Sequence, residues 1–270
     1  LGYKISKRFC MQVFLDGFER SMCIFSLISL FFYIALLLIP DIKYSFFKYK
    51  YYHTEHLTIG LYNYVSGWRN SGFASEPGLF QFFVAISMWW RERNYGFDKR
   101  VMLYIVTLVS TFSTSGFIIL LIFFIINNKF KIFIFPLILL FSSQFLMVFE
   151  NQIDNKLNGY AFESRFIPLK NSFNYISENL TGVGNIQYSN DLNKYNIGSF
   201  DSYSQISMRY GMQALILFIF LSFLLMKKAF FLSIIFMVTF TSQTIWYFPV
   251  VSCFYFYVIH NFYYERKVLC

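Results

Sequence analysis

Charged residues are scarce in this chain. They make up 14% of its 270 residues, whereas hydrophobic residues make up 57% and the mean hydropathy is +0.48. A soluble domain needs more charge than this to keep its surface hydrated, so the composition excludes an ordinary soluble protein. The apolar residues come in long runs, which is typical of an integral membrane protein.

Cysteine and histidine are also rare. The cysteines are scattered, without the paired spacing of a zinc site or a disulfide framework, so we expect them to pack as apolar side chains: Cys10, Cys23, Cys253 and Cys270. His53 and His56 flank Glu55, but this is not the zinc-protease spacing. No histidine lies between residues 150 and 210, so hydrolase chemistry based on Ser, His and Asp has no support. We therefore expect neither a metal nor a cofactor.

The apolar runs predict an all-α, polytopic membrane protein. We expect a single integral membrane domain over residues 1–270 with about eight helical passes, some of them shorter than the roughly 20 residues that cross a bilayer. Two outer loops are expected at 40–78 and 150–210. The expected spans are 22–39, 79–90, 101–113, 116–126, 132–149, 211–226, 229–248 and 250–263.

The positions of the basic residues decide how residues 101–126 cross the membrane. This segment can form one ordinary span, or a short hairpin broken at 113–116. The hairpin places 14 of the 23 basic residues and five of the 14 acidic ones on the cytoplasmic side. The whole net charge of +9 then faces the cytoplasm, as membrane insertion favours, and both termini are cytoplasmic. Basicity here indicates topology and not nucleic-acid binding.

Short spans predict a recessed polar pocket on the outer face, because a non-helical tip is tolerated at membrane depth only where protein covers it or water reaches it. We expect the segments 69–78, 113–116 and 150–210 to converge there. Apolar residues recur at helical spacing from Phe162 to Ile176, with Asn179 and Gly182 as stop signals, so the large outer loop is predicted to contain an amphipathic helix.

Three charged residues are the main candidates for chemistry: Arg69, Glu76 and Arg165. Glu76 precedes Pro77, a favoured first helical residue, so its carboxylate is expected at the positive end of a helix. It can cap that helix, act chemically, or do both. The two guanidinium groups suit phosphate oxygens near a low-dielectric boundary, although salt bridges to nearby carboxylates are a competing use.

Four motifs occur in a set order. RNSGFASEPGLF at 69–80 looks like an outer-loop motif leading into a helix, and STFSTSG at 110–116 is similar to a Thr/Ser-rich break. Arg165 followed by NLTGVGN at 179–185 looks like a loop arginine before a Gly-Val-Gly turn. DSYSQ at 201–205, with RYG at 209–211, is similar to the polar patch that closes this loop. Together they resemble the bacterial O-antigen and capsular polysaccharide polymerase family, and more distantly the O-antigen ligases, over about residues 60–262.

The resemblance implies a metal-independent glycosyltransferase with GT-C-like architecture in the bacterial inner membrane. It would move a glycan from undecaprenyl diphosphate onto another lipid-linked oligosaccharide at the periplasmic face. Arg69 and Arg165 would stabilise the diphosphate leaving group, and Glu76 would accept the proton of the attacking hydroxyl. Expected partners are membrane lipids, a chain-length regulator and a flippase. Further residues expected to bind substrate are Ser113, Ser115, Asp201, which is also an alternative base, Tyr203 and Arg209.

Family members usually have more spans before the first motif, and this chain opens on Leu1, so we expect a truncated or short form. Ligases are expected to carry a histidine near residues 201–203, and its absence favours a polymerase. A flippase or polysaccharide exporter would need charges along its spans, which are almost charge-free here. A structural or sensory membrane protein would leave Arg69 and Arg165 replaceable.

Overall fold

A computed structural model describes residues 11–41, 47–51, 54–59, 62–65, 69–74, 76–127, 160–195, 197 and 201–242. The chain divides into two compact units. The first comprises Leu1–Leu120, Ser222–Thr239 and Ile245–Cys270, and the second comprises Leu121–Leu221 and Phe240–Thr244. The predicted spans at 132–149 and 250–263 lie outside the described residues.

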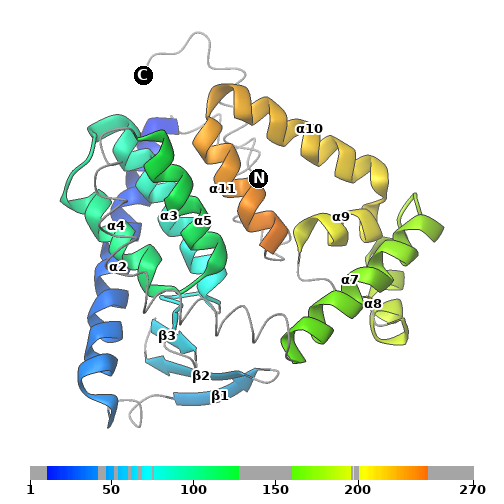
Figure 1. Ribbon diagram of the computed structural model, residues 1–270, viewed down its shortest axis with the longest axis horizontal. Helices are drawn as coiled ribbons and strands as arrows, with labels where there is room; N and C mark the ends of the chain where they lie inside the picture. The colour runs from blue at the N-terminus through cyan, green and yellow to red at the C-terminus, as the bar shows by residue number, and fades with distance from the viewer. Residues whose placement is uncertain are drawn as a thin grey trace. The chain divides into compact units, whose positions relative to one another are not determined.

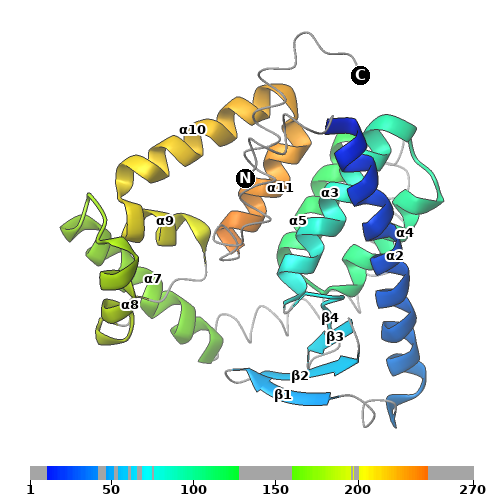
Figure 2. The same ribbon diagram turned by 180° about the vertical axis from the view of Figure 1, so that it is seen from behind.

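The first unit is built on three helices that contact one another in every pairing: α2 (Met11–Leu38), α3 (Pro77–Tyr95) and α4 (Lys99–Ser110). They stand side by side in both views (Figures 1 and 2). The interior is aromatic, and Phe73 packs on both Phe80 and Phe83 of α3. Helix α11 (Phe230–Ser242) adds Phe236, whose ring meets Phe82 edge-on. The described residues are thus mostly helical, as expected.

A small antiparallel sheet precedes α3 and was not predicted. Its order is β1 (Phe47–Tyr51), β2 (Thr54–Ile59), β3 (Tyr62–Val65) and β4 (Arg69–Asn70). The last strand, β4, contacts both α2 and α4, so Arg69 and Asn70 lie against these helices (Figure 2). The prediction of an all-α fold is therefore correct for most of the described chain and wrong for the loop at 40–78.

The predicted helix break between α4 and the following helix is present. Helix α4 ends at Ser110, and the next helix, α5 (Thr114–Ile126), begins after a turn of three residues. The turn lies at 111–113, slightly before the predicted 113–116. Phe112 has a φ of 45°, the left-handed conformation that side chains rarely adopt and that ends a helix abruptly. The segment 101–126 is consequently two helices.

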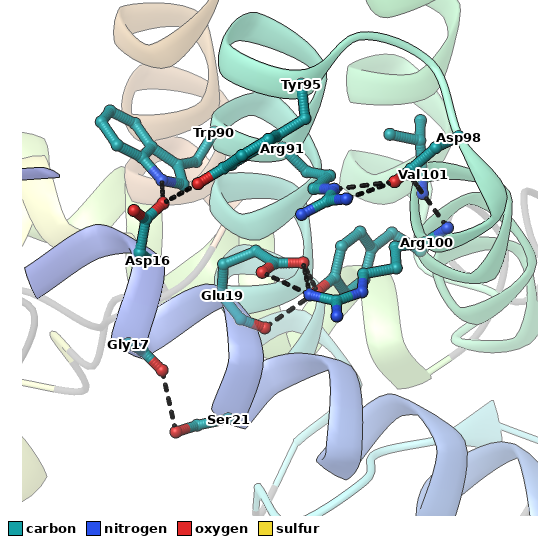
Figure 3. Close-up of polar contacts among 11 residues, drawn as sticks. Asp16, Gly17, Glu19, Ser21, Trp90, Arg91, Tyr95, Asp98, Arg100 and Val101 are labelled. Atoms are coloured by element: carbon teal, nitrogen blue, oxygen red, sulfur yellow. Dashed lines mark hydrogen bonds and ion pairs between the residues drawn. The ribbon is translucent and has the colours of Figure 1, made fainter. Parts of the chain in front are cut away.

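Acidic residues of α2 tie together the ends of α3 and α4 (Figure 3). Asp16 accepts hydrogen bonds from the indole of Trp90 at 2.8 Å and from Tyr95. Glu19, 2% exposed, accepts from Arg100 at 3.1 Å and from the Tyr104 hydroxyl at 2.8 Å. A buried carboxylate is tolerated only with such partners. The charges that sequence reasoning counted only for orientation therefore also bind the helices to one another.

The second unit contains α7 (Tyr160–Glu178), α8 (Gly184–Lys194), α9 (Ser202–Tyr210) and the first part of α10 (Met212–Lys228). Helix α7 confirms the helix predicted from Phe162 to Ile176. It ends at Glu178, just before the predicted stop signals Asn179 and Gly182, and Gly182 has a φ of 76°. The small core of the unit consists of Tyr175, Ile176, Tyr188, Ile197 and Met208.

Candidate functional site

The segment at 69–72 lies against the helix break, as predicted. The Arg69 Nε donates to the Thr111 carbonyl at 3.4 Å. The Asn70 amide nitrogen donates to the Ser110 hydroxyl at 2.9 Å and to the Ser29 hydroxyl at 3.3 Å. Asn70 is fully buried, so these bonds replace those that water would otherwise make. One side chain thereby joins β4 to both α2 and α4.

Asn70 also shapes the turn that leads into α3. Its side-chain oxygen accepts from the Gly72 backbone N–H at 2.9 Å. Gly72 has a φ of 56°, and a Cβ there would lie 2.5 Å from the Phe80 ring. Only glycine allows this backbone conformation so close to an aromatic ring. Sequence reasoning did not single out Asn70, although an asparagine two residues before a glycine is a turn signal.

Ser113 and Ser115, predicted to bind sugars, lie buried at the start of α5. Their hydroxyl oxygens are 3.0 Å apart, and the Gln81 side-chain nitrogen of α3 donates to Ser115 at 2.7 Å. Within the described residues the Gln81 side-chain oxygen is buried and has no hydrogen-bond partner. Gly116 makes room for it, because a Cβ there would lie 2.6 Å from that oxygen. The two serines therefore fasten α5 to α3.

Glu76 occupies the predicted place at the N-terminus of α3. It is the N-cap residue, in extended conformation, with Pro77 in the first helical turn. Its side chain is exposed and makes no capping hydrogen bond. The carboxylate is therefore next to the positive end of a helix and open to solvent. Glu76 was predicted to cap the helix, to act chemically, or to do both; its side chain makes no capping hydrogen bond, and the chemical role stays a prediction.

Arg165 lies in α7, and its side chain lies outside the described residues. The predicted pairing of Arg69 with Arg165 therefore stays a prediction. Asp201, proposed as an alternative base, is the N-cap of α9 and accepts from the Ser204 backbone N–H at 2.7 Å. Its carboxylate satisfies a helix N-terminus, as aspartate commonly does.

Tyr203 and Arg209 both belong to α9. The Tyr203 ring meets Phe218 and Phe240 edge-on, and burial raises the pKa of its hydroxyl to about 12. The Arg209 guanidinium lies 4.5 Å from the centre of the Tyr188 ring and donates to the Asn185 side-chain oxygen at 3.3 Å. Its stacking joins α9 to α8.

Two features of the site escaped sequence reasoning. Gln81 is a single amide within the otherwise apolar start of α3, and Asn70 is the buried centre of the bonds between β4 and the helices. A buried polar residue in an apolar helix is a usable signal, because it must find a partner. No family model, curated protein or solved structure matches the chain.

Proposed function

We propose that this chain is a multi-pass glycosyltransferase of the bacterial inner membrane that polymerises undecaprenyl diphosphate-linked oligosaccharide repeat units into O-antigen or capsular polysaccharide. The observation that carries the proposal is the hydrogen-bonded junction between residues 69–72 and 110–115. This junction supports a functional site because two motifs, about 40 residues apart in the sequence, meet there through the buried Asn70 amide.

A membrane location is supported by the way α2 distributes its residues. Its buried side includes Glu19, Ser26 and Ser29, whereas from residue 24 onward every exposed residue is apolar: Ile24, Leu27, Ile28, Phe31, Ile34, Leu37 and Leu38. Water favours the opposite arrangement, and a lipid surround favours this one. Among the described residues, α2 alone combines the length and the hydropathy of a membrane span: an 18-residue stretch within Gln12–Leu38 has a mean hydropathy of 2.4. The apolar helices α5, α10 and α11 are shorter.

The proposed orientation is supported by the two ends of α3. Its N-terminus, beside Asn70, carries the exposed Glu76. Its C-terminal end bonds to Asp16 of α2 through Trp90 and carries Arg91, which forms an ion pair with Asp98. The apolar part of α3, from Pro77 to Trp90, has 14 residues and is about 21 Å long, which makes it one of the short passes that the sequence predicts. Helix α3 therefore carries the charged end and the proposed reaction site at opposite termini.

The proposed reaction is an exchange of one bond to the anomeric carbon of the donor glycan. A sugar hydroxyl of the acceptor attacks that carbon, the bond from the carbon to the diphosphate oxygen breaks, and the diphosphate leaves with its electron pair. Glu76 takes the hydroxyl proton, since its carboxylate is exposed and commits no oxygen to the helix cap. Arg69 stabilises the charge that develops on the diphosphate. Arg165 is proposed as the second cation.

The test uses a host strain whose repeat-unit polymerisation depends on this protein. Arg69→Ala, Glu76→Gln and Arg165→Ala are introduced singly, and Arg93→Ala serves as the control. Arg93 is exposed at the opposite end of α3. We expect the first three to lose the long-chain ladder while single repeat units still reach the cell surface, and the control to keep it.

Three other results would contradict the proposal. Unchanged ladders in all three variants, at membrane levels equal to the parent chain, would remove the site assignment. Loss of single-repeat material together with the ladder would indicate a ligase. Loss of transport of lipid-linked units across the membrane would indicate a flippase. Arg69→Lys refines the assignment, because lysine keeps the positive charge but cannot form the bidentate hydrogen bonds that a guanidinium group makes to a diphosphate.

A further inference from the structure

The second unit contains a polar cavity of about 440 Å³ whose lining includes none of the residues assigned to the proposed reaction above. It is bounded by the C-terminal half of α7, by α8 and by the residues that follow α8. Small-molecule pockets usually fall between 300 and 1,000 Å³ and are mostly apolar. This one has an ordinary volume and an unusual lining, which includes Asn174, Tyr175, Glu178, Gln187, Asp191 and Tyr195.

The walls of the cavity are held by hydrogen bonds between the helices. The Tyr175 hydroxyl donates to the Asp191 carboxylate at 2.6 Å, which links α7 to α8. Burial, together with this bond, raises the pKa of Tyr175, so its hydroxyl keeps the proton that it donates. The amide of Asn171 donates to the Tyr195 carbonyl at 3.2 Å. The cavity is thus a formed feature of the helix packing.

Asn174, Glu178 and Gln187 present exposed polar groups to the cavity. A side-chain amide offers both donors and acceptors, and a carboxylate offers acceptors only. A ligand that satisfies all of them must itself donate and accept at several closely spaced points. Adjacent hydroxyl groups on one small ring have this property, whereas an apolar ligand would leave these groups unpaired.

The charge of the lining disfavours an anion. Among the described residues, two carboxylates, Glu178 and Asp191, line the cavity, and no lysine or arginine does. Lys194 lies over the Tyr195 ring at 4.9 Å from its centre, outside the lining, and already interacts with Asp191. A diphosphate or a sugar phosphate placed here would face two like charges. The Tyr175 and Tyr195 rings, 6.0 Å apart at 45°, add aromatic surface for the C–H edges of a ring.

We infer that this cavity is a binding subsite for an uncharged saccharide ring, with a lining that contains none of the residues assigned to the diphosphate. In the proposed function it would hold one sugar of the glycan. The identity of that glycan rests on the proposed function, whereas the binding chemistry rests on the cavity alone.

The experiment measures sugar binding directly, with the full chain purified in a detergent that carries no sugar headgroup. Glucose, galactose and N-acetylglucosamine are titrated by saturation-transfer difference NMR, and glucose 1-phosphate is the charged counterpart. We expect saturable, millimolar binding of at least one neutral sugar and weaker binding of glucose 1-phosphate. Gln187→Ala should weaken binding of the neutral sugar by about 2- to 10-fold, because it removes one hydrogen bond.

Asn190→Ala is the matched control, because Asn190 is another exposed amide on α8 and does not line the cavity. It should bind like the parent chain. Glu178→Gln tests the charge argument. It removes one negative charge at an exposed position, so glucose 1-phosphate should gain affinity relative to the neutral sugar. Equal melting temperatures of the variants exclude misfolding as the cause of any loss.

Three results would overturn the inference: absence of binding by all three neutral sugars, equal effects of Gln187→Ala and Asn190→Ala, or tighter binding of glucose 1-phosphate by the parent chain. The ladder assay separates this inference from the proposed function. Sugar binding that survives in a chain without polymerase activity would leave the subsite standing and the polymerase proposal refuted. Polymerisation without sugar binding would support the polymerase proposal and refute the subsite.

Discussion

Gly182 and Gly211 lie backbone against backbone in the second unit. A Cβ on Gly182 would overlap the Gly211 amide, and a Cβ on Gly211 would lie 2.6 Å from the Thr181 carbonyl group. The close approach lets the Met212 N–H donate to the Leu180 carbonyl at 2.8 Å and the Val183 N–H donate to the Met208 carbonyl at 3.1 Å. Two short motifs about 30 residues apart are thereby joined through their main chains.

Replacing Gly182 by alanine should destabilise the protein more than replacing Gly184. Both glycines have a φ of 76°, so both alanines carry the backbone strain of a left-handed residue, on the order of 1 kcal/mol. Nothing lies within 4 Å of a Cβ on Gly184, whereas a Cβ on Gly182 meets main-chain atoms. Thermal unfolding in detergent should show the lower melting temperature for Gly182→Ala. Equal melting temperatures would contradict the close approach.

Asn70→Ala should unfold at a lower temperature than the parent chain. It removes the donor to Ser110 and Ser29 and the acceptor for the Gly72 N–H, all of them buried. A buried group left without a partner costs about 1–3 kcal/mol. Asn94→Ala is the control, since its exposed amide donates to a carbonyl of its own helix. The same melting temperature in both variants would show that the junction contributes nothing to stability.

Asp98 should make the stability of the chain depend on acid. Although burial opposes it, hydrogen bonds from Arg91 and from the Val101 and Arg100 N–H groups lower the pKa of Asp98. A carboxyl whose pKa is lower in the folded state stabilises the fold above its unfolded pKa, about 3.9. That contribution is lost as the pH falls through the folded pKa. The pair therefore matters at neutral pH and not in strong acid.

Asp98→Asn isolates the charge, because asparagine caps a helix nearly as well as aspartate. Its deficit in melting temperature should be present at pH 7 and should shrink below about pH 4. Asp98→Ala should carry a further deficit of about 1 kcal/mol at every pH, from loss of the cap. Melting curves over pH 3–8 make the measurement. A constant deficit of Asp98→Asn across this range would refute the assignment.

Alkaline phosphatase fused after Ser115 should be active, because the enzyme works only outside the cytoplasm and the proposed hairpin places its tip there. A fusion after Phe97, between α3 and α4, should be inactive. Phe97 lies in the connection between α3 and α4, and Ser115 lies in the first turn of α5, so both fusion points are next to predicted turns. Activity after Phe97 with none after Ser115 would invert the proposed topology.

Local signals predicted the start of α3, the break before α5 and the end of α7, whereas α8 and α9 were not predicted. Pro77 opens α3 because its missing N–H costs nothing in the first turn, and the polar residues at 110–115 interrupt an apolar run. The stop after α7 followed from Asn179 and Gly182. Each of these depends on neighbours within a few residues, which a single sequence contains.

The sheet at 47–70 was not predicted, because residues 40–78 were interpreted as a polar outer loop; its last strand, β4, contacts α2 and α4. Glu19 and Arg100 were counted as separate charges of opposite sign, and their ion pair joins residues 81 apart. Asp201 is a residue for which sequence suggested chemistry, whereas the fold uses it as a helix cap. Ser115 likewise bonds to Gln81 across two helices.

The sequence by itself determined the start of α3, the break between α4 and α5 and the end of α7, because hydrophobic patterning and capping act over a few residues. The tertiary structure alone decided that Asn70 meets Ser110, that Gly182 meets Gly211, and that Tyr175 and Asp191 close a polar cavity. These contacts join distant parts of the chain, and whether a polar group can be buried at all depends on the partner that folding brings to it.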